Sequence, residues 1–432
     1  GKSVAIAEGG RFGGSCVNYG CTPTKTIVAS ARAAHMARRG PDFGGVTGEI
    51  RIDFTRVMER QNEMRHSSSS GLENWLSNMQ NVDVYHEFAT FESPHTIRAG
   101  DEVIGGETIV INAGGRARNV EIQGIDGVDW LNNRRLLELQ ALPQHMIVVG
   151  GSYIGLEFAQ MYRRFGSKVT VIEMQDRIIG RDDDDVSDAV KEILEGEGVN
   201  FRMNADCIGV SRHEAGVAVR VSCVENPDDV IGSHVLLAVG RIPNTADLGL
   251  EEAGIETNRF GFIEVDDELR TNVPGVWALG DVNGRGAFTH TSYNDFEIVA
   301  ANLFDGDARR VSDRILCYGL FIDPPLGRIG MTEKEVLASG RRALVGKRMM
   351  TRVGRAREFG DTRVFIKILV DAETEEILGA AILGMNGDEA IHCLLDTMYA
   401  KKPYTLVSRA VHIHPTVAEL IPTVLQEMTP LN

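Results

Sequence analysis

The sequence lacks any apolar stretch long enough to cross a bilayer. A transmembrane helix needs about 18 to 20 consecutive apolar residues, and Gly, Ser and Glu interrupt the two most apolar segments, near 146–159 and 234–240. The first ten residues, GKSVAIAEGG, also lack the long apolar core and the cleavage pattern of a secretory signal. We therefore expect a cytoplasmic protein without a membrane partner.

Positive charge is scarce as well. The 432 residues include 45 Lys and Arg against 61 Asp and Glu, a formal net charge of −16, and the basic residues form no cluster. Such a charge opposes non-specific binding to nucleic acid or to an anionic membrane, so we expect no nucleic-acid partner. With 43% hydrophobic and 25% charged residues, a chain of this length is typical of a multidomain globular protein.

Cysteine is also rare. Six cysteines are too few for a disulfide scaffold in a chain of this size. Four of them stand alone in the sequence, and we expect these to be buried thiols: Cys207, Cys223, Cys317 and Cys393. The other two, Cys16 and Cys21, share the segment GGSCVNYGCTPTK at 13–25.

The spacing of this cysteine pair predicts an irregular backbone. On a regular helix five positions rotate by about 140° beyond a full turn, which puts the two side chains on different faces and too far apart to bridge. Gly20 permits an unusual turn, and Thr22 and Pro23 fit the cap and first position of a helix over 22–39. Cys21 then lies at the positive end of that helix, where a thiol becomes a reactive thiolate. The alternative is two buried cysteines in a Gly-rich loop.

A second α/β unit begins near residue 146. An apolar strand over 146–149, a Gly-containing turn, a helix over 154–165 and a strand over 169–173 predict a parallel sheet. The turn reads VVGGSYIGLEF, in which Gly150 and Gly155 occupy the first and third glycine positions of the dinucleotide-binding fingerprint and Ser152 the second. The alternative is a plain strand–turn–helix.

An acidic residue supports the nucleotide interpretation. Glu173 follows Gly150 by 23 positions, at the end of the next strand. A carboxylate there accepts the ribose hydroxyls of NAD and repels a 2′-phosphate, so we expect NAD(H). Arg177 is the reason to keep NADP(H) open.

The GGSCVNYGCTPTK segment resembles the redox-disulfide motif of the class I flavoprotein pyridine nucleotide-disulfide oxidoreductases, the family of dihydrolipoamide dehydrogenase, glutathione reductase and mercuric reductase. The resemblance covers nearly the whole chain. It implies an FAD-dependent enzyme in which Cys16 attacks the substrate, Cys21 lies against the flavin and Lys25 is a cation near flavin N5. It also implies that Glu157 pairs with Lys25, and that Tyr153 covers the nicotinamide pocket.

The same resemblance implies the cofactor sites. The family also has a strand, a G-x-G-x-x-G turn and a helix of about 30 residues before the position of Gly1, which cradle the FAD pyrophosphate and which this sequence does not contain. The expected FAD-binding residues are Glu8, Gly14, Ser15, Lys25, Ala89, Ala113, Gly114 and Asp281. The expected nicotinamide-nucleotide residues are Gly150, Ser152, Tyr153, Gly155, Glu173 and Gly240.

The segment HIHPTVAEL at 412–420 resembles the HPTxxE motif of the family. It would make His414 the general acid/base that protonates the leaving thiolate, and Glu419 the residue that orients the imidazole. The cysteines lie in the first domain and His414 near the end of the last, so we expect a homodimer in which His414 of one chain faces Cys16 of the other.

The substrate is expected to be a small-molecule disulfide or another electron acceptor. The overall sequence resembles the mercuric-reductase-like branch, but the final LQEMTPLN lacks the cysteine pair with which mercuric reductases capture the metal. One alternative is dihydrolipoamide dehydrogenase, although the segment FTHTSYND at 288–295 differs from the LAH-type segment of that enzyme. Another alternative is a catalytically silent flavoprotein that serves as a redox sensor or assembly partner. We assign no metal site, because the acidic run 182–185 fits a solvated cap before a helix.

These features predict an α/β fold with two Rossmann-like dinucleotide-binding domains, for FAD and NAD, and a C-terminal α+β dimerisation domain. We expect the FAD domain in two parts, at 1–120 and 245–312, an inserted NAD(P) domain at 121–244 and the dimerisation domain at 313–432. The region 50–80 is polar and helix-like, and we expect the SSSS run at 67–70 to form a loop in it.

Overall fold

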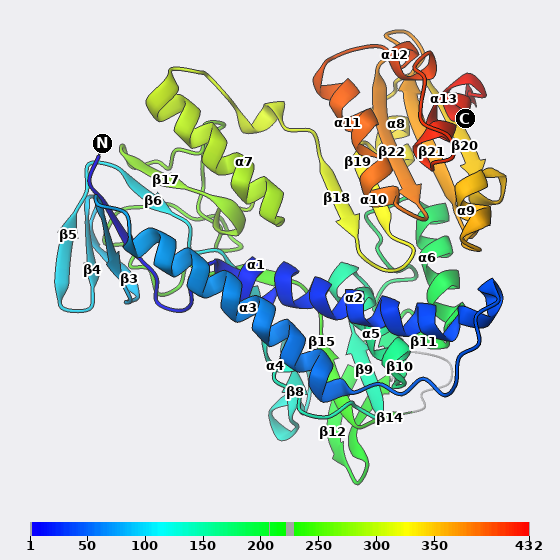
Figure 1. The fold of residues 1–432 in the computed structure, drawn as a ribbon. Helices are drawn as coiled ribbons and strands as arrows, with labels where there is room; N and C mark the ends of the chain where they lie inside the picture. The colour runs from blue at the N-terminus through cyan, green and yellow to red at the C-terminus, as the bar shows by residue number, and fades with distance from the viewer. Residues whose placement is uncertain (1, 207, 222–228, 432) are drawn as a thin grey trace.

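The structure is a computed structural model that describes residues 2–206, 208–221 and 229–431. The molecule contains two larger sheets, one of five strands and one of six, together with several smaller sheets, and a pair of long helices runs along it (Figure 1). The fold class expected from the sequence, a mixed α/β fold with a separate C-terminal unit, is confirmed.

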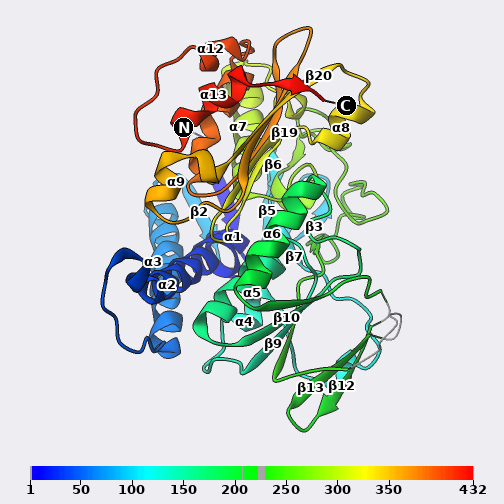
Figure 2. The same ribbon diagram turned by 90° about the vertical axis from the view of Figure 1, so that its right-hand side faces the viewer.

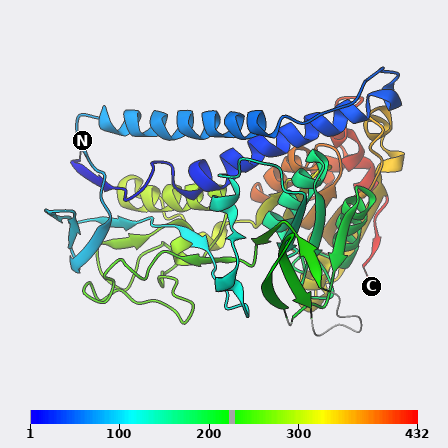
Figure 3. The same cartoon turned by 90° about the horizontal axis from the view of Figure 1, so that it is seen from below.

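The N-terminal part holds the long helices. Its elements are β1 (Val4–Ala7), α1 (Gly14–Tyr19), α2 (Cys21–Arg38), η1 (Gly40–Phe43), α3 (Phe54–Ser77) and β2 (Val82–Tyr85), which pairs in parallel with β1. Helices α2 and α3 lie side by side along one face of the molecule (Figure 3).

The expectation of a loop at the four consecutive serines is wrong. Residues 67–70 lie inside α3, which runs without a break from Phe54 to Ser77. Serine has only a modestly unfavourable helix propensity, and Ser69 is buried, with its hydroxyl donating to the carbonyl of Phe12 at 2.7 Å. Tertiary packing therefore decides this segment.

Smaller strands follow. They are β3 (Ala89–Ser93), β4 (Thr96–Ala99) and β5 (Glu102–Gly105) in one antiparallel sheet, then β6 (Ile109–Ile111), which pairs in parallel with β17 (Val276–Ala278), and β7 (Gly115–Ala117), which pairs with β16 (Arg241–Pro243). Strand β17 leads into η3 (Gly280–Asn283), α7 (Thr289–Ala300) and the π-helix η4 (Ala301–Asp305). Strands that precede the five-stranded sheet in the sequence therefore pair with strands that follow it.

The five-stranded sheet has the order β11-β10-β9-β15-β8, and every pair in it is parallel, as expected for the second α/β unit. Its elements are η2 (Ile125–Gly127), β8 (Trp130–Leu131), α4 (Asn133–Leu136), β9 (His145–Val149), α5 (Tyr153–Phe165), β10 (Lys168–Ile172), α6 (Asp184–Gly196), β11 (Val199–Arg202) and β15 (His234–Leu237). A second, antiparallel sheet projects beside it (Figure 2), built from β12 (Ile208–His213), β13 (Gly216–Val221) and β14 (Val230–Gly232).

The C-terminal unit is an antiparallel six-stranded sheet with the order β18-β19-β22-β21-β20-β23. Strands β21 and β22 are buried along their whole length, although β21 includes Lys367 and Asp371. The elements are η5 (Val311–Asp313), β18 (Cys317–Leu320), β19 (Leu326–Gly330), α8 (Glu333–Ala338), β20 (Ala343–Met349), η6 (Met350–Arg352), α9 (Gly354–Glu358), β21 (Phe365–Asp371), β22 (Ile377–Leu383), α10 (Gly387–Ala390), α11 (His392–Tyr399), α12 (Thr405–Ser408), η7 (Ala418–Leu420), α13 (Ile421–Gln426) and β23 (Thr429–Pro430).

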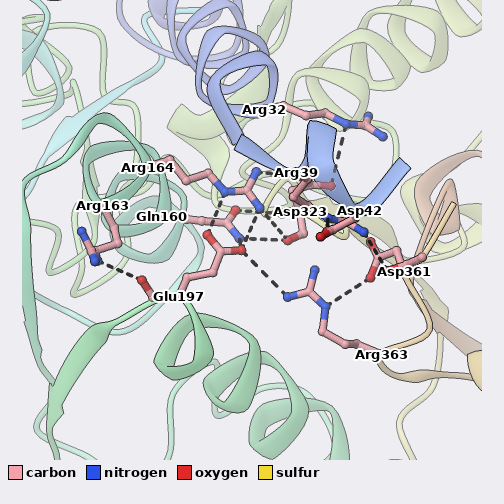
Figure 4. A network of polar contacts seen from close by, with 11 residues as sticks. Arg32, Arg39, Asp42, Gln160, Arg163, Arg164, Glu197, Asp323, Asp361 and Arg363 are labelled. Atoms are coloured by element: carbon pink, nitrogen blue, oxygen red, sulfur yellow. Dashed lines mark hydrogen bonds and ion pairs between the residues drawn. The ribbon is translucent and has the colours of Figure 1, made fainter. Parts of the chain in front are cut away.

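A buried ionic network joins these units (Figure 4). Arg164 of α5 donates to Glu197 at 2.7 Å and to Asp323 at 2.7 Å, and the Arg164 side chain is only 4% exposed. Arg32 of α2 lies 3.8 Å from the same Asp323. Since α2 begins at Cys21, the network fixes the helix that carries the predicted redox cysteine against the other two units.

The four isolated cysteines differ from expectation where they are described. Cys317 and Cys393 are half-buried free thiols rather than fully buried ones, because they lie on the edge strand β18 and on the partly exposed helix α11. Cys207 and Cys223 lie outside the described residues. No helix in the described ranges is both long enough and apolar enough to span a membrane.

Candidate functional site

The two predicted redox cysteines lie on either side of a helix break. Cys16 is in α1, and Cys21 is the first residue of α2. Between them Gly20 adopts φ −131° and ψ −113°, and a Cβ atom there would lie 2.9 Å from the carbonyl oxygen of Ser15. Glycine is therefore required for the close approach that brings the thiols together. The expected cap was wrong: Gly20 is the N-cap and Pro23 the third helical residue, because the helix starts two residues earlier, at Cys21.

The surroundings give the two thiols different acidities. A hydrogen bond with Cys16 is the main cause that lowers the pKa of Cys21 to about 6, helped by the Thr289 hydroxyl and the charge of Lys25, which together outweigh partial burial. The Sγ of Cys21 lies 3.3 Å from the Thr289 oxygen. The same cysteine–cysteine hydrogen bond, followed by burial, raises the pKa of Cys16 far above its ordinary value. At neutral pH the pair therefore holds a thiolate at Cys21 and a thiol at Cys16.

Thr289 was not expected from the sequence. It is the first residue of α7, 268 positions away from Cys21. Its segment, FTHTSYND at 288–295, only predicts a departure from the LAH-type segment of dihydrolipoamide dehydrogenase. Nothing in the local sequence indicates this contact, because it depends on how α7 packs against the cysteine turn.

Lys25 and Glu157 are in contact, as expected. The Nζ atom of Lys25 donates to Oε2 of Glu157 at 2.5 Å, and the Glu157 side chain is 6% exposed. The other carboxylate oxygen accepts from the backbone N–H of Phe321 at 3.0 Å, and Lys25 also lies over the Phe321 ring, 4.5 Å from its centroid. The buried carboxylate thus holds the ammonium group one helical turn from Cys21.

Residues from three distant segments meet at Arg241. Its guanidinium donates to the carbonyl of Gly115 at 2.5 Å, and lies 3.4 Å from Oγ of Ser15 and 3.2 Å from the carboxylate of Asp281. Ser15 also donates to the Gly115 carbonyl at 3.2 Å. Two expected FAD-binding residues, Ser15 and Asp281, therefore share one cationic partner. The sequence does not predict a role for Arg241, although it directly follows Gly240, an expected nucleotide-binding residue.

Asn244 shapes the turn at Ala113 and Gly114. Its side chain donates to the Ala113 carbonyl at 2.9 Å, and its backbone N–H to the Gly114 carbonyl at 3.0 Å. This turn connects β6 to β7 and therefore leads directly to Gly115 at the Arg241 cluster.

The remaining expected FAD-binding residues lie at element ends. Glu8 follows β1 and accepts from the backbone N–H of Gly10 at 2.8 Å, Gly14 begins α1, and Ala89 begins β3. No atom lies within 4 Å of the position where a Cβ of Gly14 would stand, so the start of α1 is open to a ligand. Carboxylates, a cation and an open glycine turn are groups that suit a flavin dinucleotide.

The nucleotide fingerprint forms a tight turn between β9 and α5. Gly155 is required there, because a Cβ on it would lie 2.1 Å from the Gly150 carbonyl oxygen. Ser152 is the exposed N-cap of α5, and its side chain makes no capping hydrogen bond. Glu173 accepts from the backbone N–H of Gly151 at 2.6 Å, so the expected ribose-binding carboxylate touches the turn itself.

Arg177 does not face this turn as a free cation. It forms ion pairs with Asp184, at 3.6 Å, and with Asp188, both at the start of α6. Its charge is therefore already compensated by two carboxylates. This weakens the case for a 2′-phosphate partner.

The acidic run is only partly the solvated cap that was expected. Asp184 is exposed at the start of α6, but Asp182 and Asp183 are 1% and 2% exposed. The reason is tertiary: the ammonium group of Lys367, on the buried strand β21, lies 2.8 Å from Asp183 and 2.7 Å from Asp185. These carboxylates compensate a buried cation.

His414 and Glu419 form the expected pair. The Nδ1 atom of His414 lies 2.7 Å from Oε2 of Glu419, whose side chain is 15% exposed. The His414 side chain is 80% exposed. Among the described residues it makes no hydrogen bond or ion pair with either redox cysteine of its own chain.

Comparison with known protein families agrees with this geometry. Residues 1–295 match the model of the pyridine nucleotide-disulphide oxidoreductase family, and residues 317–425 match that of the corresponding dimerisation domain. The chain belongs to the pyridine nucleotide-disulphide oxidoreductase family, whose members are FAD-dependent flavoprotein enzymes that use NAD(P)H and act on sulfur groups.

Several individual relatives cover nearly the whole chain. A probable pyridine nucleotide-disulfide oxidoreductase, RclA of Escherichia coli (strain K12), is 35% identical over 97% of this chain and 92% of its own. A mercuric reductase of Streptomyces lividans is 29% identical, over 99% of this chain and 92% of its own. A dihydrolipoyl dehydrogenase of Chlorobaculum parvum is 30% identical, over 98% of this chain and 91% of its own.

A solved structure extends the likeness to three dimensions. The Cu(II) complex of the HOCl-induced flavoprotein disulfide reductase RclA from Escherichia coli matches with a TM-score of 0.89 and 34% identity, over 99% of this chain and 95% of that one.

Proposed function

We propose that this protein is an FAD-dependent NADH:disulfide oxidoreductase in which Cys16 and Cys21 form the redox-active pair. The observation that carries the proposal is the polarised thiol pair, with a thiolate at Cys21 and a half-buried thiol at Cys16 across the Gly20 break. Disulfide exchange requires a thiolate as the attacking group, and the Thr289 hydroxyl and the Lys25 charge both favour the thiolate at Cys21.

FAD, when bound, supplies the group that accepts hydride from NADH and passes two electrons to the Cys16–Cys21 disulfide. We assign its binding to Glu8, Gly14, Ser15, Lys25, Ala89, Ala113, Gly114 and Asp281. Arg241 is added because it contacts two of these residues. We further propose the domain boundaries expected above, with the FAD domain at 1–120 and 245–312, the NAD(P) domain at 121–244 and the dimerisation domain at 313–432.

The exchange chemistry then follows from the thiols. Two electrons and one proton convert the disulfide into a Cys21 thiolate and a Cys16 thiol. After Cys16 gives up its proton, its sulfur attacks the acceptor disulfide, and one acceptor sulfur leaves as a thiolate that takes a proton. The Cys21 thiolate next attacks the Cys16 sulfur, which releases the second acceptor thiolate and restores the Cys16–Cys21 bond.

His414 is the proposed proton carrier for these steps. Glu419 holds its Nδ1, which leaves Nε2 free to exchange protons. Because His414 is exposed on its own chain, we propose that it serves Cys16 of the partner subunit in a homodimer formed through the dimerisation domain.

For the nucleotide we propose NADH over NADPH. Glu173 lies against the fingerprint turn, where it would repel a 2′-phosphate, while the nearby Arg177 is neutralised by Asp184 and Asp188. NADPH stays the second choice.

Single cysteine variants of the flavin-loaded, full-length protein test the proposal. Cys21→Ser should abolish the long-wavelength charge-transfer absorbance of the two-electron-reduced enzyme. Cys16→Ala should keep a thiolate at position 21 and flavin reduction by NADH, yet lose disulfide turnover. An undiminished absorbance band in the first variant, or surviving turnover in the second, would refute the assigned roles.

The acceptor is tested with a panel of disulfides, quinones and metal ions. Lipoamide belongs in it because a dihydrolipoyl dehydrogenase is 30% identical, mercuric ion because a mercuric reductase is 29% identical, and Cu(II) because a relative was solved as its Cu(II) complex. A protein that oxidises little NADH with every acceptor would favour the alternative of a silent flavoprotein sensor or assembly partner.

A further inference from the structure

Tyr153 is tied to a buried carboxylate beside the nucleotide fingerprint. It is the first residue of α5, directly after the turn that ends at Ser152. Its hydroxyl donates to Oδ2 of Asp182 at 2.5 Å, and the Asp182 side chain is fully buried. The ring itself is only half-buried, so it borders both the fingerprint turn and the protein interior.

A second tyrosine completes the arrangement from another unit. Tyr318, on strand β18, donates to Oδ1 of Asp182 at 3.1 Å. Its ring meets that of Tyr153 edge-on, with centroids 5.4 Å apart and an interplanar angle of 80°. Phe288 stacks with Tyr318, with ring centroids 5.7 Å apart, and directly precedes Thr289, the partner of Cys21.

Asp182 is held in place by buried charge. Arg328, on strand β19, is 1% exposed and lies 3.8 Å from Oδ1 of Asp182. Within the described part of the chain its guanidinium nitrogens make no hydrogen bonds, so its attraction to the carboxylate is electrostatic. Asp182 therefore accepts hydrogen bonds from two tyrosines while Arg328 compensates the charge.

We propose that Asp182 is a positioning residue that holds Tyr153 closed over the nicotinamide pocket, so that nicotinamide entry requires the Tyr153–Asp182 hydrogen bond to break. This rests on the proposed function, because it assumes that a nicotinamide nucleotide binds at the fingerprint. It goes further by naming Asp182 as the group that binds the Tyr153 hydroxyl in the closed state. It also links the nucleotide turn, through Asp182, to Tyr318 on β18 and Arg328 on β19 of the C-terminal unit. The bond makes the empty, closed state more stable and so weakens nucleotide binding.

The test separates the nicotinamide from the rest of the dinucleotide. ADP-ribose carries the adenosine and pyrophosphate but no nicotinamide, so it does not need Tyr153 to move, whereas NAD⁺ does. Tyr153→Phe keeps the ring and removes the hydroxyl. Tyr162→Phe is the matched control, because Tyr162 lies on the same helix and its buried hydroxyl has no hydrogen-bond partner among the described residues.

In Tyr153→Phe, calorimetric titration of the flavin-loaded protein should show the Kd of NAD⁺ falling about tenfold, the effect of one hydrogen bond to a charged group. The Kd of ADP-ribose should stay unchanged, and Tyr162→Phe should change neither value. In an Asp182→Asn background the same Tyr153→Phe change should have a much smaller effect.

The outcomes distinguish the two proposals. If the unmodified protein binds neither ligand, the nucleotide site itself is wrong, and the closure proposal falls with it. If both ligands bind but Tyr153→Phe leaves NAD⁺ affinity unchanged, or shifts ADP-ribose equally, Tyr153 is not held closed by Asp182. An equal effect of Tyr153→Phe in both backgrounds would likewise overturn the role of Asp182.

Discussion

The acidity of Cys21 depends on a contact that can be removed without touching either cysteine. Thr289 places its hydroxyl 3.3 Å from Cys21 Sγ, and this hydrogen bond favours the thiolate over the thiol. Thr289→Val keeps the shape of the side chain and removes the hydroxyl. We therefore expect the pKa of Cys21 to rise from its value of about 6.

The size of the rise follows from the geometry. A hydrogen bond to a charged group contributes about 1.5–3 kcal/mol, and one pKa unit corresponds to about 1.4 kcal/mol. Because Cys21 is exposed and sulfur is a weak acceptor, the lower end applies, which predicts a rise of about one unit. At pH 7 the thiolate fraction should then fall from about nine-tenths to about one half, while above pH 9 the variant and the parent should be equally ionised.

The assay is the rate of alkylation of Cys21 by iodoacetamide as a function of pH, measured on reduced protein carrying Cys16 and identified by peptide mass. Only the thiolate reacts, so the midpoint of the rate profile reports the pKa. Thr289→Ser retains a hydroxyl and should keep a midpoint near the parent value. A Thr289→Val midpoint equal to that of the parent would show that the α7 hydroxyl does not stabilise the thiolate.

Three further predictions test other parts of the protein. Glu173→Gln keeps an acceptor for the fingerprint turn but removes the negative charge. The ratio of kcat/KM for NADH to kcat/KM for NADPH should therefore fall about tenfold, which corresponds to about 1.4 kcal/mol. Equal kcat/KM values for both nucleotides in the parent would contradict the proposed preference. Inactive Cys16→Ala and His414→Ala subunits should regain activity when they exchange into heterodimers, because one of the two sites then carries neither defect, and heterodimers that form but stay inactive would exclude the trans arrangement. Arg164→Met leaves two buried carboxylates without their cation and should lower the free energy of unfolding by about 3–5 kcal/mol in urea titration. The matched control is Arg342→Met, which removes the exposed ion pair between Arg342 and Glu373 and should lower the free energy of unfolding by less than about 1 kcal/mol. Similar losses of stability in both variants would contradict the importance of burial.

Local sequence was sufficient wherever turn chemistry decides the structure. The pair of cysteines five positions apart around Gly20 predicted a broken helix, and the glycines of the fingerprint predicted a tight turn between a strand and a helix. These features depend on steric limits within a few residues, so the sequence expresses them directly. The pairing of His414 with Glu419, in contrast, was expected through the family resemblance.

Contacts between distant segments could not be predicted in this way. The pairing of Lys25 with Glu157 was expected through the family resemblance and not from spacing, and Thr289 beside Cys21 was not expected at all. Such contacts depend on how whole helices and sheets pack, and neither partner carries a local signal of the other.

Burial was likewise decided by the tertiary structure. The serines at 67–70 continue a helix, because α3 packs its Ser69 onto the N-terminal segment instead of leaving it to solvent. Asp182 and Asp183 belong to a run that, by itself, is typical of an exposed helix cap. The C-terminal unit places Arg328 and Lys367 against them, and a carboxylate that meets a buried cation is withdrawn from water together with it.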